Sequence, residues 1–243
     1  MADIKLLRPE VTITTSIGEL NQALHRCELA GRLCYDSTDK LDPCLVNKEF
    51  LGRLINKHHE SVLEHASFSA VFLTDRAVTH QLVRHRLSSF SQQSQRYCRY
   101  SCGEGKHKMA FIEPFWGGTK ELGLLTEGLK AAADTYEKLL QAGMKPEEAR
   151  AVLPNCTATK IYVTANVRQW RHILKERLAP GAQFDIMMLM YSVYRSLEDA
   201  GFGYLVSDIP VCDKAHIAWP SYRDWTTTHP MSEHPVQETY PIQ

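Results

Sequence analysis

Residues 84–97 read RHRLSSFSQQSQRY and carry the most informative pattern in the chain. An Arg-His-Arg triplet is followed by hydroxyl and amide side chains, then by Arg96 and Tyr97, and only Leu87 and Phe90 offer apolar bodies to a core. Buried polar groups would each need a partner, so the stretch is hard to bury as packing. The pattern therefore predicts a polar site that lines a cleft and takes anionic ligands. The alternative is a solvated basic loop.

Strand and helix patterns lie on both sides of this stretch. Asp75 can cap a short helix that ends at Arg84, so the motif is expected to leave a helix and enter a loop. Alternation of apolar residues predicts strands, and apolar residues at helical spacing predict helices. The predicted strands cover 4–15, 66–73, 109–112 and 157–167, and the predicted helices cover 19–33, 45–58, 75–84, 120–142, 146–153, 168–177 and 184–200. The methionine stripe of the last helix is expected in the core or in a subunit contact.

Composition and charge exclude several classes of protein. The 243 residues suffice for one large domain, and Lys plus Arg equals Asp plus Glu at 28 each. No global field therefore draws the chain to nucleic acid or to an anionic membrane. No run is long enough for a membrane helix, and the N-terminus lacks the apolar core of a signal peptide, so a cytoplasmic protein is expected. Seven irregularly spaced cysteines predict reduced thiols.

Two clusters could suggest a metal, and neither has the right spacing. His58, His59 and His65 lie near Glu60 and Glu64, but His59 and His65 are six residues apart, unlike the His-Glu-x-x-His pattern. Cys98 and Cys102 have no second pair of ligands at a suitable spacing. No metal site is therefore predicted. No glycine cluster matches a phosphate loop or a dinucleotide fingerprint either.

A series of motifs resembles the flavin-dependent thymidylate synthases. Arg84-His85-Arg86, seven residues and Ser94 resemble the signature of that family. Further matches in order are AGRLCY at 30–35, the segment around His59, EARAVLP at 148–154, Asn166-x-Arg168, and Arg177. Together these matches cover about residues 20–200. The resemblance implies an α/β (α+β) fold with an antiparallel-strand sheet flanked by helices, and not a Rossmann fold.

The resemblance also implies the reaction, its cofactors and its assembly. Members of the family convert dUMP to dTMP with methylenetetrahydrofolate as carbon donor and NADPH as reductant, through bound FAD. They assemble as homotetramers whose flavin sites take residues from several subunits, and they bind neither nucleic acid nor membrane. A paralogue that modifies another pyrimidine nucleotide, or installs another one-carbon group, stays an alternative. A nucleic-acid module that stacks bases on Tyr97 and Tyr100 is a second one, although the balanced charge disfavours it.

Site residues follow from the resemblance, residue by residue. The cofactor would be held by His59, Ser61, Glu64, Arg84, His85, Arg86, Asn166, Arg168 and His172. The substrate would be held by Gln81, Gln92, Ser94, Gln95, Arg96, Arg150 and Arg177. Arginine suits such phosphorylated ligands because its planar fork gives paired hydrogen bonds and keeps its charge.

Arg177 and Ser94 are the two candidate catalytic residues. A cation beside a uracil carbonyl would stabilise enolate character as carbon 5 becomes nucleophilic, which is the role expected for Arg177. Ser94 has no adjacent base, so it is expected to bind and orient the pyrimidine without acting as a nucleophile. No cysteine lies in a recognisable nucleophile context. Residues 1–205 are expected to form a single catalytic domain, and the Pro/His/Thr-rich residues 206–243 an irregular extension.

Overall fold

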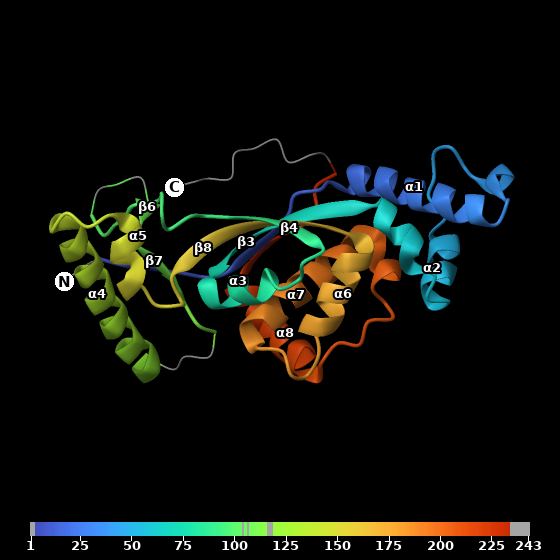
Figure 1. Ribbon diagram of the computed structural model, residues 1–243. Helices are drawn as coiled ribbons and strands as arrows, with labels where there is room; N and C mark the ends of the chain where they lie inside the picture. Colours follow the sequence, from blue (N-terminus) through green and yellow to red (C-terminus); the bar gives the residue numbers. More distant parts are fainter. Residues whose placement is uncertain (1–2, 104, 106, 116–118, 234–243) are drawn as a thin grey trace.

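The computed structural model describes residues 3–103, 105, 107–115 and 119–233, and its centre is a five-stranded sheet (Figure 1). The strand order is β4 (Ser88–Gln92), β8 (Ala158–Asn166), β3 (Ser67–Asp75), β2 (Glu10–Ile13) and β9 (Thr227–His229). The first four strands pair antiparallel, and β9 adds to β2 in parallel. The expected α/β fold with an antiparallel-strand sheet is confirmed, and the parallel edge strand is an addition.

Helices cover one face of the sheet. Apolar side chains alternate along β3 and β8, where Phe68, Phe72 and Ile161 are fully buried. Below this face in Figure 1 lie α3 (Arg76–Leu82), α6 (Val167–Arg177), α7 (Phe184–Leu197) and α8 (Asp213–Trp225). Trp170 of α6 stacks on Phe68 with ring centroids 4.8 Å apart and donates from Nε1 to the Phe68 carbonyl at 2.9 Å. This packing fixes α6, and with it the residues that α6 carries toward the site.

Helix α7 is buried on almost every side. It lies between the sheet, α6 and α8, and its methionines 187, 188 and 190 are at most 1% exposed. The methionine stripe therefore belongs to the core, one of the two places that the sequence left open. Short helical turns follow α7 at Glu198–Phe202, where the backbone kinks at Gly201, and at Gly203–Leu205.

The two ends of the sheet carry different units (Figure 1). At one end lie α1 (Ile17–Cys34), the 3-10 turn Thr38–Lys40, α2 (Lys48–Asn56) and the 3-10 helix Glu60–His65. At the other end α4 (Thr119–Gln141), α5 (Pro146–Ala149) and the 3-10 turn Arg150–Val152 pack on a second, smaller core around Phe111 and Tyr136. Short parallel pairs complete this end: β1 (Lys5–Leu7) with β7 (Ala110–Ile112), and β5 (Tyr100–Ser101) with β6 (His107–Lys108).

The structure differs from the predictions made from the sequence at two places. The prediction that the Arg84 motif continues as a loop is wrong for residues 88–92, which form β4 and pair with β8 because Ser88, Phe90 and Gln92 turn inward in alternation. The prediction of an irregular extension over residues 206–243 is wrong for most of residues 206–233, the part that the structure describes. Helix α8 forms there because Trp219, Tyr222 and Trp225 recur at helical spacing and their aromatic rings pack together, and β9 forms by pairing with β2.

The division at residue 205 stays a prediction, and residues 234–243 lie outside the described residues. In the part of the chain that the structure describes, no helix combines the length and the apolar character needed to cross a membrane. The cytoplasmic location is an untested prediction.

The start of α1 gives a first stability prediction. Ser16 is 1% exposed, its hydroxyl accepts from the Glu19 backbone N–H, and the Glu19 carboxylate accepts from the Ser16 backbone N–H at 2.8 Å. This capping box satisfies two donors at the helix start. Ser16→Ala is expected to lower the free energy of unfolding by about 1 kcal/mol in urea titrations. The exposed helical serine of the control Ser221→Ala should change it by less than about 0.5 kcal/mol, and equal effects would contradict the capping role.

Candidate active site

A cavity of about 1190 Å³ opens where the end of α3, the start of α6 and the 3-10 helix meet. Its wall gathers seven of the nine predicted cofactor residues from three separate parts of the chain. These are Glu64, Arg84, His85, Arg86, Asn166, Arg168 and His172. Residues more than 100 positions apart in sequence therefore line one cavity. The motifs predicted that these residues form one site, but the sequence alone could not show where in the fold this site lies.

The start of α6 gives the cavity an anion-binding end. Asn166 caps the helix, since its side chain accepts from the Gln169 backbone N–H at 2.8 Å. The free backbone N–H groups and the helix dipole at such an end favour negative ligands. Arg168 follows directly, and its guanidinium donates to the Glu64 carboxylate at 2.6 Å, with both side chains about half exposed. Exposed Arg84 and Arg86 add positive charge to the same wall.

His85 lies at the back of the cavity and is 7% exposed. Burial, and then the neighbouring Arg177 and His172, lower the pKa of His85 from 6.5 to about 4. Arg177 donates from Nε to Nε2 of the imidazole at 3.0 Å. Because a guanidinium can only donate, this hydrogen bond requires an unprotonated Nε2 and places the ring proton of neutral His85 on Nδ1. The His172 ring meets His85 edge-on at 5.8 Å between centroids.

The other two predicted cofactor residues, His59 and Ser61, line a second cavity of about 310 Å³. The two cavities adjoin, because His58, Glu60 and Arg168 belong to both walls. The hydroxyl of Tyr35, at the end of α1, is hydrogen-bonded to Nδ1 of His59 at 2.8 Å. Cys34 lies on the same wall, with an exposed thiol.

The predicted substrate residues form two groups. The first group contacts the wall of the large cavity through the hydrogen bond from Arg177 to His85. Arg177 also donates from Nη2 to the Gln81 carbonyl at 3.2 Å, and the Gln81 side chain donates to Gln183 at 2.6 Å. Burial lowers the pKa of Arg177. Because arginine still keeps its charge at neutral pH, Arg177 presents a fixed cation with a set orientation.

The second group lies beside α5. Arg96 pairs with the Glu147 carboxylate at 2.5 Å, and Arg150 donates to the Glu147 carbonyl at 3.2 Å, so two cations meet at one residue. The Ser94 hydroxyl accepts from the Arg96 backbone N–H at 3.1 Å. Gln95 is 6% exposed, and its buried Nε2 finds no hydrogen-bond partner within the described part of the chain. Nothing on the described wall of the large cavity comes from this group.

Gln92 differs from the other predicted substrate residues. Its amide nitrogen donates to the hydroxyls of Thr79 at 2.9 Å and Thr159 at 3.4 Å, both of which are buried. The nitrogen end of the side chain is therefore anchored between α3 and β8. The carbonyl end of Gln92 is the part that stays available to a ligand.

The sequence reasoning gave no role to several residues at the site. Arg171, 5% exposed, donates two hydrogen bonds to Asp208 at 2.7 and 2.8 Å and one to Glu60 at 2.9 Å. It thereby fixes the 3-10 helix and the segment after α7 against α6. Arg171 falls in a helix that the sequence described only as having a basic face, and neither carboxylate is near it in sequence. Lys175 also lines the large cavity.

Metal chemistry gains no support from the side chains. Among the residues that the structure describes, no three His, Cys, Asp or Glu side chains are placed to hold a metal ion. All seven cysteines are free thiols, and burial raises the pKa of Cys27 to about 12.

The depressed pKa of His85 predicts a pH dependence of stability. A histidine with a pKa near 6.5 in the unfolded chain and about 4 in the folded chain binds its proton more tightly when unfolded. The free energy of unfolding should therefore fall as the pH is lowered from about 6.5 to about 4, by roughly 2–3 kcal/mol. Urea titrations at several pH values measure it. In His85→Gln, whose side chain can still accept from Arg177, this loss should be absent, and an unchanged pH profile would contradict the assignment.

Comparison with known proteins gives the family. The model of the thymidylate synthase complementing protein family matches residues 17–200. The flavin-dependent thymidylate synthase of Geobacter sulfurreducens is 38% identical over 206 residues, which are 77% of this chain and 88% of the relative. The enzyme of the same name from Mycobacterium tuberculosis is 38% identical over 189 residues, 70% of this chain and 73% of that protein.

Solved structures agree on the fold. ThyX from Helicobacter pylori, solved with FAD and dUMP, gives a TM-score of 0.65 at 22% identity and covers 83% of this chain and 98% of its own. The UMP/dUMP methylase PolB from Streptomyces cacaoi, bound with 5-Br dUMP, also gives 0.65, at 21% identity, over 83% of this chain and 95% of its own. At such identities the structures support the fold alone. The family match and the relatives show that this chain belongs to the flavin-dependent thymidylate synthase family, that of the thymidylate synthase complementing proteins.

Proposed function

We propose that the protein is a flavin-dependent thymidylate synthase that converts dUMP to dTMP. Methylenetetrahydrofolate would supply the carbon, and NADPH would supply the reducing equivalents through FAD. The observation that carries the proposal is the large cavity, in which Arg84, Arg86 and Arg168 surround the positive end of α6. The resemblance of the motifs to the family assigns this same set of donors to FAD.

The cavity fits FAD in charge and in size. FAD carries a pyrophosphate, and guanidinium groups at a helix start provide charge-assisted hydrogen bonds for it. The volume of about 1190 Å³ exceeds what most ligand pockets offer and is large enough for a dinucleotide cofactor. His172 and neutral His85 add flat, polarisable surfaces on the same wall. When bound, FAD supplies hydride transfer, and the chain binds and orients it.

The substrate residues would position and polarise the pyrimidine. Arg177 is held by His85 and the Gln81 carbonyl, so its cation does not have to reorganise when negative charge develops on a uracil oxygen. Arg96 and Arg150 would bind the phosphate of dUMP, since both guanidinium groups already gather at Glu147. The unpartnered Nε2 of Gln95 is a further donor beside Ser94.

Self-association is part of the proposal. Arg96 and Arg150 meet at Glu147 of α5, and the described wall of the large cavity includes none of the predicted substrate residues. A second copy of the chain could bring Arg96 and Arg150 to the site of its neighbour. We therefore expect a homotetramer, and light scattering after size-exclusion chromatography would measure its mass. A monomer with full activity would contradict this part.

One assay tests the reaction. The purified protein is incubated with FAD, NADPH, methylenetetrahydrofolate and dUMP carrying tritium at carbon 5, and tritium release and product mass are followed. Release with formation of dTMP is expected. A parallel reaction with UMP tests the alternative of another pyrimidine nucleotide. A product other than dTMP, or none in the complete mixture, would overturn the proposal.

Ser94→Ala tests the role of the hydroxyl. Ser94 accepts a backbone hydrogen bond within its own turn, and no base among the described residues is hydrogen-bonded to its hydroxyl, so its proposed task is orientation. The variant should keep slow turnover, with kcat/KM lowered roughly 10- to 100-fold because the pyrimidine is less well placed. Complete loss of turnover with normal dUMP binding would instead identify a nucleophile.

A further inference from the structure

A buried ion pair in α1 belongs to the wall of neither cavity, although its neighbour Gly31 lines the second one. Glu28 is 0% exposed and Arg32 is 5% exposed, and Arg32 donates from Nε and Nη2 to one Glu28 oxygen, both at 2.7 Å. Removing two charges from water is costly, and a well-packed apolar pair of the same size often stabilises a protein at least as well. Stability alone is therefore a weak explanation for this pair. The contacts of the pair with α2 give a better explanation.

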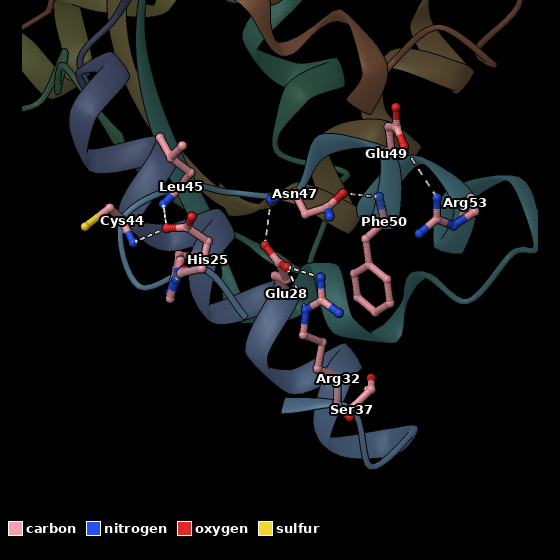
Figure 2. A network of polar contacts seen from close by, with 11 residues as sticks. His25, Glu28, Arg32, Ser37, Cys44, Leu45, Asn47, Glu49, Phe50 and Arg53 are labelled. Atoms are coloured by element: carbon pink, nitrogen blue, oxygen red, sulfur yellow. Dashed lines mark hydrogen bonds and ion pairs between the residues drawn. The ribbon is translucent and has the colours of Figure 1, made fainter. Parts of the chain in front are cut away.

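The pair joins α1 to the start of α2 (Figure 2). The second Glu28 oxygen accepts from the Asn47 backbone N–H at 2.6 Å, and the Asn47 side chain caps α2 by accepting from the Phe50 N–H at 2.9 Å. The Arg32 guanidinium lies over the Phe50 ring, 4.6 Å from its centroid. One carboxylate and one guanidinium thus fix where α2 begins relative to α1.

The two helices also contact each other at Gly31, one residue before Arg32. A Cβ atom added to Gly31 would lie 2.9 Å from side-chain atoms of both Phe50 and Leu54. The absence of a side chain at Gly31 lets Phe50 and Leu54 of α2 pack directly on α1, so Gly31 and the ion pair act together at the contact between the two helices. A change in the contact between α1 and α2 would therefore shift the segments that follow the two helices.

Both segments lead to His59. At the end of α1, the Arg32 carbonyl accepts from the backbone N–H groups of Tyr35 and Ser37. After α2, the backbone turns through His58, whose φ is +59°, and the His59 N–H bonds back to the Leu54 carbonyl at 2.8 Å. The Tyr35 hydroxyl then meets Nδ1 of His59 at 2.8 Å, on the wall of the second cavity.

We propose that Glu28 and Arg32 are positioning residues that hold the Tyr35 hydroxyl on His59 and so orient the His59 imidazole on the wall of the second cavity, which adjoins the large one. The inference rests on the proposed function for the location of the cofactor, but the geometric link can be measured without it. Arg32 touches neither cavity wall, so it would act only through the two helices.

The experiment compares ion-pair variants in the ligand-free protein and in FAD titrations. Histidines are labelled with ¹⁵N, and the His59 signals are assigned with His59→Gln. In Arg32→Met and in Glu28→Gln, the His59 Nδ1 signal should move toward its position in Tyr35→Phe, and FAD binding should weaken roughly 10-fold. The double variant Arg32→Met/Tyr35→Phe should show no further loss of FAD affinity, because both changes remove the same contact.

Two further variants separate position from stability. Glu28→Leu/Arg32→Met replaces the pair by apolar side chains of similar volume and is expected to fold even where a single change does not. It should retain its melting temperature while the His59 signal still moves. The matched control Glu49→Leu/Arg53→Met removes an exposed pair on α2, whose side chains are 89% and 61% exposed, and should change neither signal nor affinity.

The outcomes decide between the inference and the proposed function. An unchanged His59 signal in the folded apolar variant, or additive effects of Arg32→Met and Tyr35→Phe, would overturn the positioning role. Absence of FAD binding in the wild-type protein would contradict the proposed function, while the His59 signals would still test the ion pair.

Discussion

Arg177→Lys is expected to lower kcat/KM for dUMP roughly 100- to 1000-fold, which is what loss of one aligned donor to a developing oxyanion costs. Lysine keeps the positive charge, but it cannot donate from one atom to His85 and from another to the Gln81 carbonyl, as Arg177 does at 3.0 and 3.2 Å. The cation would then point in several directions, and the charge would no longer be preorganised for the proposed contact with a uracil carbonyl. The loss should appear in kcat more than in KM, because the interaction strengthens in the transition state.

Steady-state kinetics with dUMP as the varied substrate measure this loss, and the binding of dUMP is measured separately. Arg195→Lys is a matched control on α7, where the guanidinium pairs with Glu198 and Asp199 outside the site. It should change kcat/KM by less than about twofold. A loss confined to KM would show that Arg177 contributes ground-state binding only, and an equal loss in both variants would show that the effect is not specific to the site.

The elements with strong periodicity were predictable from sequence. The helix over 120–142 is found as α4 (Thr119–Gln141), and the strand over 157–167 as β8 (Ala158–Asn166). Residues 88–92 were missed because serine and glutamine have little strand preference by themselves, and only pairing with β8 stabilises β4. Helix α8 was missed because Pro220 and the polar residues around it outweighed the spacing of its aromatic residues.

The site was predictable in its residue types and not in its contacts. Motifs identified Arg84, Arg168 and Arg177, and the fold brings the first two to one cavity and the third against His85. The partners that hold such residues come from distant segments without a motif of their own. Tyr35 and His59 are 24 positions apart and Arg96 and Glu147 are 51 apart, so no local pattern could pair them.

Arg168→Ala is expected to weaken FAD binding at least 100-fold and to give a colourless purified protein. Arg168 is the second residue of α6, where its side chain, the helix dipole and the N–H groups at the helix start all favour an anion. The alanine variant also leaves Glu64 without its partner at 2.6 Å, so an uncompensated carboxylate would face the cofactor phosphates. The lost charge-assisted hydrogen bond and the added repulsion both weaken FAD binding, and their combined effect is larger than that of either one.

Titration of the apoprotein with FAD, followed by flavin absorbance and fluorescence, measures the affinity. Arg168→Ala/Glu64→Gln should recover part of the lost affinity, because it removes the repelling carboxylate and leaves only the lost donor. Arg223→Ala, an exposed arginine of α8 paired with Asp224, is the control and should bind FAD as the wild type does. Since the interaction is electrostatic, the difference between the wild type and Arg168→Ala should shrink as the salt concentration rises. A difference that is independent of salt, or no recovery in the double variant, would place the pyrophosphate away from the start of α6.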